Sequence, residues 1–353
     1  MLFLITSGWV GKAMPNYVVT TRAAQDSIFS DDPGPTSFLQ VPDGAKTIGP
    51  SNAISRDGWV RKVIAKAGRK LDETGVMRGD VLVFIHGYDN EPPIVLERHR
   101  RLQADLPQYG FDGAVVSFDW PAKQVALAYL EDREKAKLTA FQLVKDCIEL
   151  FARMQSGAEC DINVHLLAHS TGAYVVREAF DDADDRRSIA AVNWTASQVA
   201  FIGADLSAAS MSAGNPESES IYRHCVRLTN YANPFDEVLQ ISNVKRAGLA
   251  PRVGRVGLPP DAPRQAVNIN CGDYYQAMIQ TRSKESIIGY PSHSWHIGDP
   301  VFTEDLAHTL NGDLDRSAIG TRMGLPSGQF KLVKPQTLIA TAVSTPVLVI
   351  PAV

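Results

Sequence analysis

The fold of this chain is decided by the stretch Val164-His165-Leu166-Leu167-Ala168-His169-Ser170-Thr171-Gly172-Ala173. Its apolar first half predicts a buried strand, and the residues after the serine predict a helix through Phe180. Small residues two positions before and two positions after Ser170 are needed where a strand turns sharply into a helix, because larger side chains would collide across the turn. Such a turn exposes the hydroxyl at a helix N-terminus, whose N–H groups stabilise negative charge. Ser170 is therefore predicted to be a nucleophile rather than a structural turn serine.

A second apolar strand that ends in a tight turn lies upstream, in Val81-Leu82-Val83-Phe84-Ile85-His86-Gly87-Tyr88. This second element supports the interpretation of Ser170 as a nucleophile. Support is needed because the small-x-Ser-x-Gly pattern alone should arise by chance in roughly a quarter of chains of this length. A turn after His-Gly lets the backbone N–H of Tyr88 face the serine and pair with that of Thr171 to form an oxyanion hole. His86 precedes the serine, whereas the base of such a site follows it. His86 is therefore interpreted as a residue that stabilises the turn.

Short β-branched runs alternate with longer helical patterns along the chain, which is typical of a mostly parallel sheet with helices on both faces. The predicted fold class is therefore α/β. The predicted strands are Tyr17–Thr21, Val81–Ile85, Ala114–Phe118, Val164–Ala168, Val199–Ile202, Val226–Tyr231 and Ala266–Ile269. One predicted helix has an apolar face with three- and four-residue steps, formed by Leu138, Phe141, Val144, Ile148 and Phe151, and we expect this face and the neighbouring Cys147 to lie in the core.

Composition is that of an ordinary soluble globular chain, with 353 residues of which 44% are hydrophobic and 21% charged. The formal net charge of −4 gives no basic field, so nucleic acid is a poor candidate partner. The cysteines lie far apart, with no CxxC pair and no metal-ligand spacing, at Cys147, Cys160, Cys225 and Cys271. We therefore expect reduced thiols, with neither a zinc site nor a disulfide framework.

The two ends of the chain are predicted to lie outside the compact fold. Residues 1–13 are interpreted as a disordered or extraneous extension, residues 14–332 as the folded domain, and residues 333–353 as an apolar C-terminal arm. The arm is not a membrane span, because Pro346 and Pro351 break its apolar stretch. The N-terminus lacks the positively charged region of a secretory signal, so a cytoplasmic location is expected.

Several motifs in a fixed order resemble those of the bacterial α/β-hydrolases called DUF900, a lipase- and esterase-like group. The shared motifs are NYVVTTR, VFIHGYDN, VVSFDWP, the AYLEDREKA helix start, LLAHST, IGADL, LTNYANPFDEVLQIS and a late SHSW, and they span residues 16–310. This resemblance implies the α/β-hydrolase fold, a Ser-Asp-His triad, and no metal or organic cofactor. Thr171 stands where the group has methionine, which changes the lining of the pocket and not the backbone donor.

Two aspartates that follow predicted strands are candidates for the acid of the triad. Asp205 follows the strand at Val199–Ile202, and Asp236 follows the strand at Val226–Tyr231. Both satisfy the chain order of serine, acid and histidine that this fold uses. Asp236 fits the usual position beyond the strand after next and matches the aspartate before an Ala/Val-Leu pair in the family. We therefore favour Asp236, and Asp205 is interpreted as a capping or site-lining residue.

The base is expected on a loop after the last strand, from which an imidazole can reach both the serine and the acid. His293 and His296 both qualify, in Pro291-Ser292-His293-Ser294-Trp295-His296. His293 aligns with the His-Ser-aromatic element of the family and is the predicted base. His296 is interpreted as a surface-loop histidine, and His308, within a predicted helix, as a structural one.

The predicted function is hydrolysis of carboxylic esters through an acyl-enzyme, with a small-molecule ester as the partner and no cofactor. About 20 residues separate Asp205 from the strand at Val226, which leaves no room for a large helical cap, so short and medium acyl chains are expected. Residues 23–58, 242–264 and 272–292 remain candidates for covering the site. Four aromatic residues are candidates either for lining an acyl or aromatic pocket or for ordinary packing, namely Trp120, Tyr274, Tyr275 and Trp295.

Other functions remain open at this point. A lactonase or an amidase with the same triad shares the tetrahedral intermediate. A hydrolase-fold protein that has lost its chemistry and only binds is an alternative of a different class, against which the complete set of serine, histidine and acid argues. The sequence leaves the oligomeric state undetermined.

Overall fold

The computed structural model of the chain describes residues 14–68, 70–71, 77–88, 90–122, 137–148, 162–190, 194–245 and 250–335. The predicted N-terminal extension, residues 1–13, lies outside the described residues, as does all but the beginning of the predicted C-terminal arm. The assignment of residues 14–332 as one domain stays a prediction.

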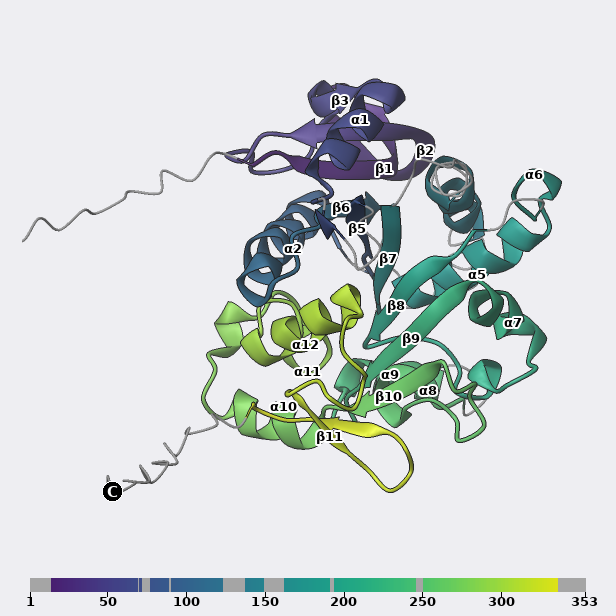
Figure 1. The fold of residues 1–353 in the computed structure, drawn as a ribbon. Coiled ribbons are helices and arrows are strands. Elements are labelled where there is room, and N and C mark those ends of the chain that lie inside the picture. The colour runs from purple at the N-terminus through teal and green to yellow at the C-terminus, as the bar shows by residue number, and fades with distance from the viewer. Residues whose placement is uncertain are drawn as a thin grey trace, which may run out of the picture.

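A mostly parallel sheet runs through the described part of the chain (Figure 1). Its strand order is β11-β12-β10-β9-β8-β7-β5-β6-β1-β2-β3, and β4 pairs with β5 beside this path. Neighbouring strands from β1 to β12 in this order are parallel, whereas β2, β3, β4 and β11 pair antiparallel with their neighbours. The strands are β1 (Asn16–Gln25), β2 (Ile28–Val41), β3 (Ala53–Ile54), β4 (Lys70–Leu71), β5 (Met77–Ile85), β6 (Ala114–Asp119), β7 (Ile162–His169), β8 (Ala196–Ile202), β9 (Cys225–Ala232), β10 (Ala266–Asn270), β11 (Arg322–Gly324) and β12 (Phe330–Leu332). The seven predicted strands and the α/β class are confirmed.

Helices cover both faces of the sheet (Figure 1). Those that matter for the core are α1 (Arg56–Lys66), α2 (Pro92–Asp105), α5 (Gly172–Asp184), α7 (Pro216–Arg223), α10 (Gly272–Ile279) and α12 (Pro300–Asn311). Alternate residues of β5 enter two separate cores, because successive side chains of a strand point to opposite faces. Val83 packs in the same core as side chains of α1, α5 and α7. Phe84 packs in the other core, with side chains of α2, α10 and α12.

Further helical segments lie in the connections. They are η1 (Pro50–Asn52), η2 (Leu106–Tyr109), α6 (Arg187–Ala190), η4 (Ala209–Met211), α8 (Glu237–Lys245), α9 (Val253–Val256), η5 (Lys284–Ser286) and α11 (Pro291–Ser294). Among the described residues, no helix has the length and apolar character that crossing a membrane requires. Three of the cysteines are free and buried, namely Cys147, Cys225 and Cys271, while Cys160 lies outside the described residues.

Residues 23–58 form part of the sheet edge. They complete β1 and contain β2 and β3, so this candidate segment for covering the site is largely strand. The sequence did not predict β2, because it contains Pro33 and Pro35, and proline is confined to edge strands and irregular positions of a sheet. The pairing of β1 with β2 is accordingly irregular, with register shifts on both sides of the Arg22–Pro33 pair.

The helix at residues 137–148 packs with a face that only partly matches the predicted one, because Val144 and Cys147 lie in the core as predicted and Leu138 and Phe141 do not. Leu138 and Phe141 are exposed by 48% and 40%. The residues that reach the core are Ala140, Leu143, Val144 and Cys147. These four positions follow the i, i+3, i+4, i+7 spacing of one helix face, so the predicted face is rotated from the observed one and overlaps it at Val144 and Cys147. Residues Val144–Ile148 are π-helical. Phe141 lies instead under the guanidinium of Arg186, 4.0 Å from the ring centroid, and Phe151 lies outside the described residues.

Candidate active site

Ser170 lies at the sharp turn between β7 and α5. Its backbone φ is +56°, and Asp26 is the only other described non-glycine residue with a positive φ. For an L-residue this left-handed conformation costs roughly 1–2 kcal/mol. Backbone hydrogen bonds hold the turn, from the Ser170 N–H to the Ile202 carbonyl (3.1 Å) and from the Asp205 N–H to the Ser170 carbonyl (3.1 Å). A strained residue that its surroundings fix so firmly is typical of a functional site.

Glycines allow the turns after β5 and β7 to touch. A Cβ added to Gly172 would lie 2.5 Å from the Ile85 carbonyl oxygen. A Cβ added to Gly87 would lie 2.5 Å from the Cβ of Ser170 and 2.8 Å from the His169 carbonyl oxygen. Real Cβ atoms do not approach other atoms so closely, so both positions require glycine. The turn with Gly87 therefore lies directly against the serine, as the sequence predicted.

Replacement of Gly87 by alanine should push the two turns apart. We expect Gly87→Ala to lower kcat by about 100-fold or more, because a displacement on the order of 1 Å at a reacting centre has that effect. The measurement is kcat for a soluble ester together with the thermal midpoint. Gly320→Ala is the matched control, since an added Cβ there meets nothing within 4 Å. Equal kcat for Gly87→Ala and the wild-type protein would show that the Gly87 turn does not contribute to the site.

His86 fixes the turn after β5, as the sequence predicted. Its Nδ1 donates to the Gly87 carbonyl oxygen (2.7 Å), and its Nε2 lies 3.1 Å from Oδ1 of Asp119. Arg22 donates from Nε to Asp119 (3.0 Å) and from Nη2 to the Asn90 carbonyl oxygen (2.8 Å). His86, Asp119 and Arg22 are almost completely buried, and burial lowers the pKa of His86. The turn is thus tied to the ends of β6 and β1.

Arg22 and Asp119 have a role that sequence analysis missed. Both stand in motifs that carry the resemblance described above, NYVVTTR and VVSFDWP, and each directly follows a predicted strand. A charge in such a place is rarely buried unless it is paired. Two opposite charges directly after two predicted strands were therefore the signal for this ion pair.

Tyr88 and Thr171, the predicted oxyanion donors, lie in the two turns that Gly87 brings together. Tyr88 directly follows Gly87, and its carbonyl oxygen accepts a hydrogen bond from the Asn90 side chain (2.8 Å). Thr171 is the N-cap residue of α5. The structure therefore places both residues beside Ser170, and their role as donors stays a prediction.

His293 and Asp236 contact each other directly. The Nδ1 of His293 lies 2.7 Å from Oδ2 of Asp236, and both side chains are buried. The second carboxylate oxygen of Asp236 accepts the N–H of Leu239 at 2.9 Å. Because two separate partners hold its oxygens, the carboxylate can orient the imidazole ring.

The His293 ring lies over the end of β8. A Cβ added to Gly203 would lie 3.0 Å from the Nδ1 and Cε1 atoms of that ring. Gly203 directly follows Ile202, whose carbonyl accepts the N–H of Ser170. The ring of His169, the residue before the serine, is also only 4.7 Å from the His293 ring between centroids. The predicted base and nucleophile therefore share these neighbours.

Asp205 has a different partner. Its Oδ1 lies 3.1 Å from Nε of Arg252, and both side chains are buried. The interpretation of Asp205 as a capping or site-lining residue stays a prediction. The contact between acid and imidazole is made by Asp236.

His296 is buried, so its interpretation as a surface-loop histidine is wrong. Only 1% of it is exposed, and its ring stacks on Trp295 with centroids 4.1 Å apart. Neither ring nitrogen has a hydrogen-bond partner among the described residues. Burial holds the pKa of His296 well below its usual value. A neighbouring tryptophan that belongs to the core brings this residue inside, which its polar sequence context did not indicate.

The aromatic residues considered for a pocket are packing residues. All are at most 8% exposed, namely Trp120, Tyr274, Tyr275 and Trp295. Trp120 donates its indole N–H to the His86 carbonyl oxygen (2.9 Å), and the Tyr274 hydroxyl donates to Asp299 (2.9 Å). Because α10 (Gly272–Ile279) carries two of these side chains into the core, the first part of the segment 272–292 belongs to the packed fold. Residues 246–249 of the candidate segment 242–264 lie outside the described residues.

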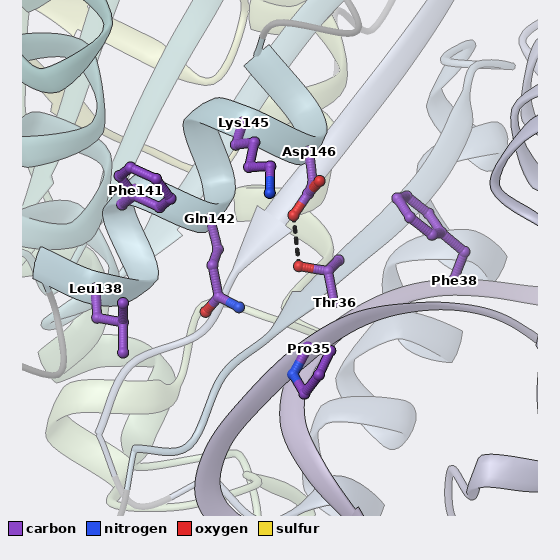
Figure 2. Close-up of a pocket in the computed structure, with 8 residues that line it drawn as sticks. All are labelled: Pro35, Thr36, Phe38, Leu138, Phe141, Gln142, Lys145 and Asp146. Atoms are coloured by element: carbon purple, nitrogen blue, oxygen red, sulfur yellow. Dashed lines mark hydrogen bonds between the residues drawn. The ribbon is translucent and has the colours of Figure 1, made fainter.

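A cavity of about 340 Å³ lies between β2 and the helix at residues 137–148 (Figure 2). Thr36 donates a hydrogen bond to Asp146 (2.5 Å) across it. The cavity is lined by Pro35, Thr36, Phe38, Leu138, Phe141, Gln142, Lys145 and Asp146. No residue of the proposed triad is among them. In the part of the chain that the structure describes, no group of three or more His, Cys, Asp or Glu side chains could hold a metal ion.

Known proteins with related sequences or structures were compared with this chain. The chain is similar to a novel cutinase-like protein from Cryptococcus sp., with 10% identity over 66% of this chain and 92% of that chain and a TM-score of 0.30. It is also similar to a dienelactone hydrolase-like promiscuous phosphotriesterase from metagenomic libraries, with 16% identity over 55% of this chain and 70% of that chain and a TM-score of 0.27. No curated protein matches the sequence. The model of the family described as "Alpha/beta hydrolase of unknown function (DUF900)" matches residues 67–271, more than half of the chain. The chain therefore belongs to the DUF900 family of α/β-hydrolases.

Proposed function

We propose that this protein is a serine hydrolase that cleaves carboxylic esters of short to medium acyl chains, with Ser170 as nucleophile, His293 as base and Asp236 as acid. The observation that carries the proposal is the 2.7 Å contact between His293 Nδ1 and Asp236 Oδ2. The ring of His293 also contacts that of His169, the residue before the strained Ser170. Membership of a hydrolase family supports it.

The proposed mechanism follows from this contact. Asp236 accepts the Nδ1 proton of His293 in a hydrogen bond, which leaves Nε2 as the atom that takes the proton of Ser170 while Oγ attacks the ester carbonyl. The N–H groups of Tyr88 and Thr171 stabilise the tetrahedral oxyanion, each by roughly 3 kcal/mol. His293 then protonates the departing alcohol, and water hydrolyses the acyl-enzyme by the reverse sequence of proton transfers.

The connection after Asp205 supports the proposed preference for shorter acyl chains. It contains α7, which packs against α5 rather than standing free as a cap. Ile221 of α7 lies in the core, and the hydroxyl of Ser220 donates to the Phe180 carbonyl oxygen (2.6 Å). This connection therefore contributes no lid that would open at a lipid interface.

Two assays test the proposal. A fluorophosphonate should label the wild-type protein, and peptide mass spectrometry should locate the label on Ser170. In a series of p-nitrophenyl esters of increasing acyl length, kcat/KM should be highest for short and medium chains, and faster hydrolysis of long-chain emulsions than of soluble butyrate would contradict that preference. Lactone and amide substrates measured beside the esters decide between the related activities. A protein that neither labels nor turns over any of them would be a binding protein, and the proposed function would be wrong.

A further inference from the structure

A buried chain of hydrogen bonds reaches the proposed catalytic histidine from behind. It begins at Arg98 on α2, passes through His169 at the end of β7, and ends at the backbone of His293. Arg98 Nη1 lies 3.3 Å from His169 Nδ1, and His169 Nε2 lies 3.2 Å from the His293 carbonyl oxygen. The side chains of Arg98 and His169 are 4% and 3% exposed.

Both contacts of His169 require the same tautomer. A carbonyl oxygen only accepts, so Nε2 must carry the proton that it donates to His293. A guanidinium only donates, so Nδ1 must be the unprotonated acceptor of the Arg98 proton. The ring is therefore neutral, with its single proton directed at His293. Burial, followed by the nearby charges of His293 and Arg98, holds the pKa of His169 well below its usual value, and His296 adds to this effect.

Among the described residues, Arg98 has only neutral partners, which is unusual for a buried cation. Besides His169, it donates from Nη2 to the Ile288 carbonyl oxygen (2.9 Å). Burial lowers the pKa of Arg98 to about 10, so the group stays charged at neutral pH. Burial of a charge among neutral groups lowers stability, and an apolar side chain could fill the same space without that cost. The guanidinium at this position thus indicates a functional contribution.

We propose that Arg98 and His169 are positioning residues that fix the main chain of His293 relative to Ser170. This inference rests on the proposed function. His169 is the covalent neighbour of Ser170, so its hydrogen bond to the His293 carbonyl sets the separation of nucleophile and base directly. Asp236 orients the imidazole ring, whereas His169 locates the backbone that carries the ring, and Arg98 keeps His169 in the tautomer that can donate.

The expected effect is moderate, because other contacts also hold α11. The Asn233 side chain donates to the Ser292 carbonyl oxygen (2.7 Å), and the Glu237 N–H donates to the Ser292 hydroxyl (3.2 Å). We therefore expect His169→Phe to lower kcat for a soluble p-nitrophenyl ester by about 10- to 100-fold, the range for a misplaced catalytic group. KM should stay within about twofold, since substrate binding does not involve this bond.

Conservative and control variants separate positioning from simple packing. His169→Gln should recover most of the lost kcat, because the amide nitrogen can donate to His293 from about the position of Nε2. Arg98→Met should reproduce the kcat loss of His169→Phe, and it carries the test if that variant fails to fold. His165→Phe is the matched control. His165 is equally buried on β7 and bonds Asp80 (3.1 Å) away from the serine, so its replacement should change the thermal midpoint and not kcat.

A double-mutant cycle decides whether His169 acts through His293. In the His293→Ala background, His169→Phe should change the rate of Ser170 acylation by p-nitrophenyl butyrate by less than about twofold, because residues that act as one unit are not additive. An equal loss in both backgrounds, or His169→Gln as impaired as His169→Phe, would overturn the proposal. A wild-type protein with no turnover and no fluorophosphonate labelling would instead reject the proposed function itself.

Discussion

Ser170→Ala should lower kcat by about six orders of magnitude, as loss of the nucleophile does in a well-studied serine protease. The residual rate should come from the oxyanion donors and from substrate binding alone. The fold should persist, because alanine also has a Cβ and meets the same strain at the φ of +56°. The backbone hydrogen bonds of the turn do not involve the hydroxyl.

The measurement combines kcat for p-nitrophenyl butyrate, labelling by a fluorophosphonate, and the thermal midpoint. Ser197→Ala is the control, because the Ser197 hydroxyl bonds the Asn163 side chain (3.2 Å) near the opposite end of the sheet. That variant should label and turn over like the wild-type protein. If Ser170→Ala still labels or keeps normal turnover, another residue is the nucleophile.

The parallel strands could be predicted from the sequence because they are buried on both faces. Val164–Ala168 is apolar except for His165, and its alternate apolar residues enter the two cores on opposite sides of the sheet. The turn at Ser170 could be predicted for a related reason. A Cβ at position 172 would collide with the backbone of β5. The glycine at this position therefore indicates a close contact with a segment that is distant along the chain.

Features that depend on the tertiary partner could not be predicted in this way. Two elements show the limit: β2 contains prolines, and the helix at residues 137–148 packs with a face rotated from the most apolar one. The choice between Asp205 and Asp236 is of the same kind, because both follow strands. The two aspartates differ in their partners, which are Arg252 for Asp205 and His293 for Asp236. Each partner lies about 50 residues away along the chain, so no local pattern predicts which of them contacts which aspartate.

Removal of the carboxylate charge should therefore have different effects at the two aspartates, because Asp236 contacts His293 and Asp205 pairs with Arg252. Asp236→Asn should lower kcat by up to about four orders of magnitude, because an amide beside Nδ1 favours the wrong tautomer of His293. Its thermal midpoint should change little. In the wild-type protein a carboxylate oxygen of Asp236 accepts the N–H of Leu239, and the amide oxygen of asparagine can accept the same hydrogen bond.

Asp205→Asn should show the opposite pattern. It leaves the buried guanidinium of Arg252 without its counter-charge, and loss of one partner from a buried ion pair destabilises a protein by about 3 to 5 kcal/mol. Its kcat, measured well below the thermal midpoint, should stay within about tenfold of the wild-type value, because the contact between Asp236 and His293 is intact. Thermal midpoints and kcat measured together on both variants distinguish a catalytic loss from an unfolded protein. A folded but inactive Asp205→Asn, beside an Asp236→Asn with near-normal turnover, would place the acid after β8 and would require the pairing of His293 with Asp236 to serve structure alone.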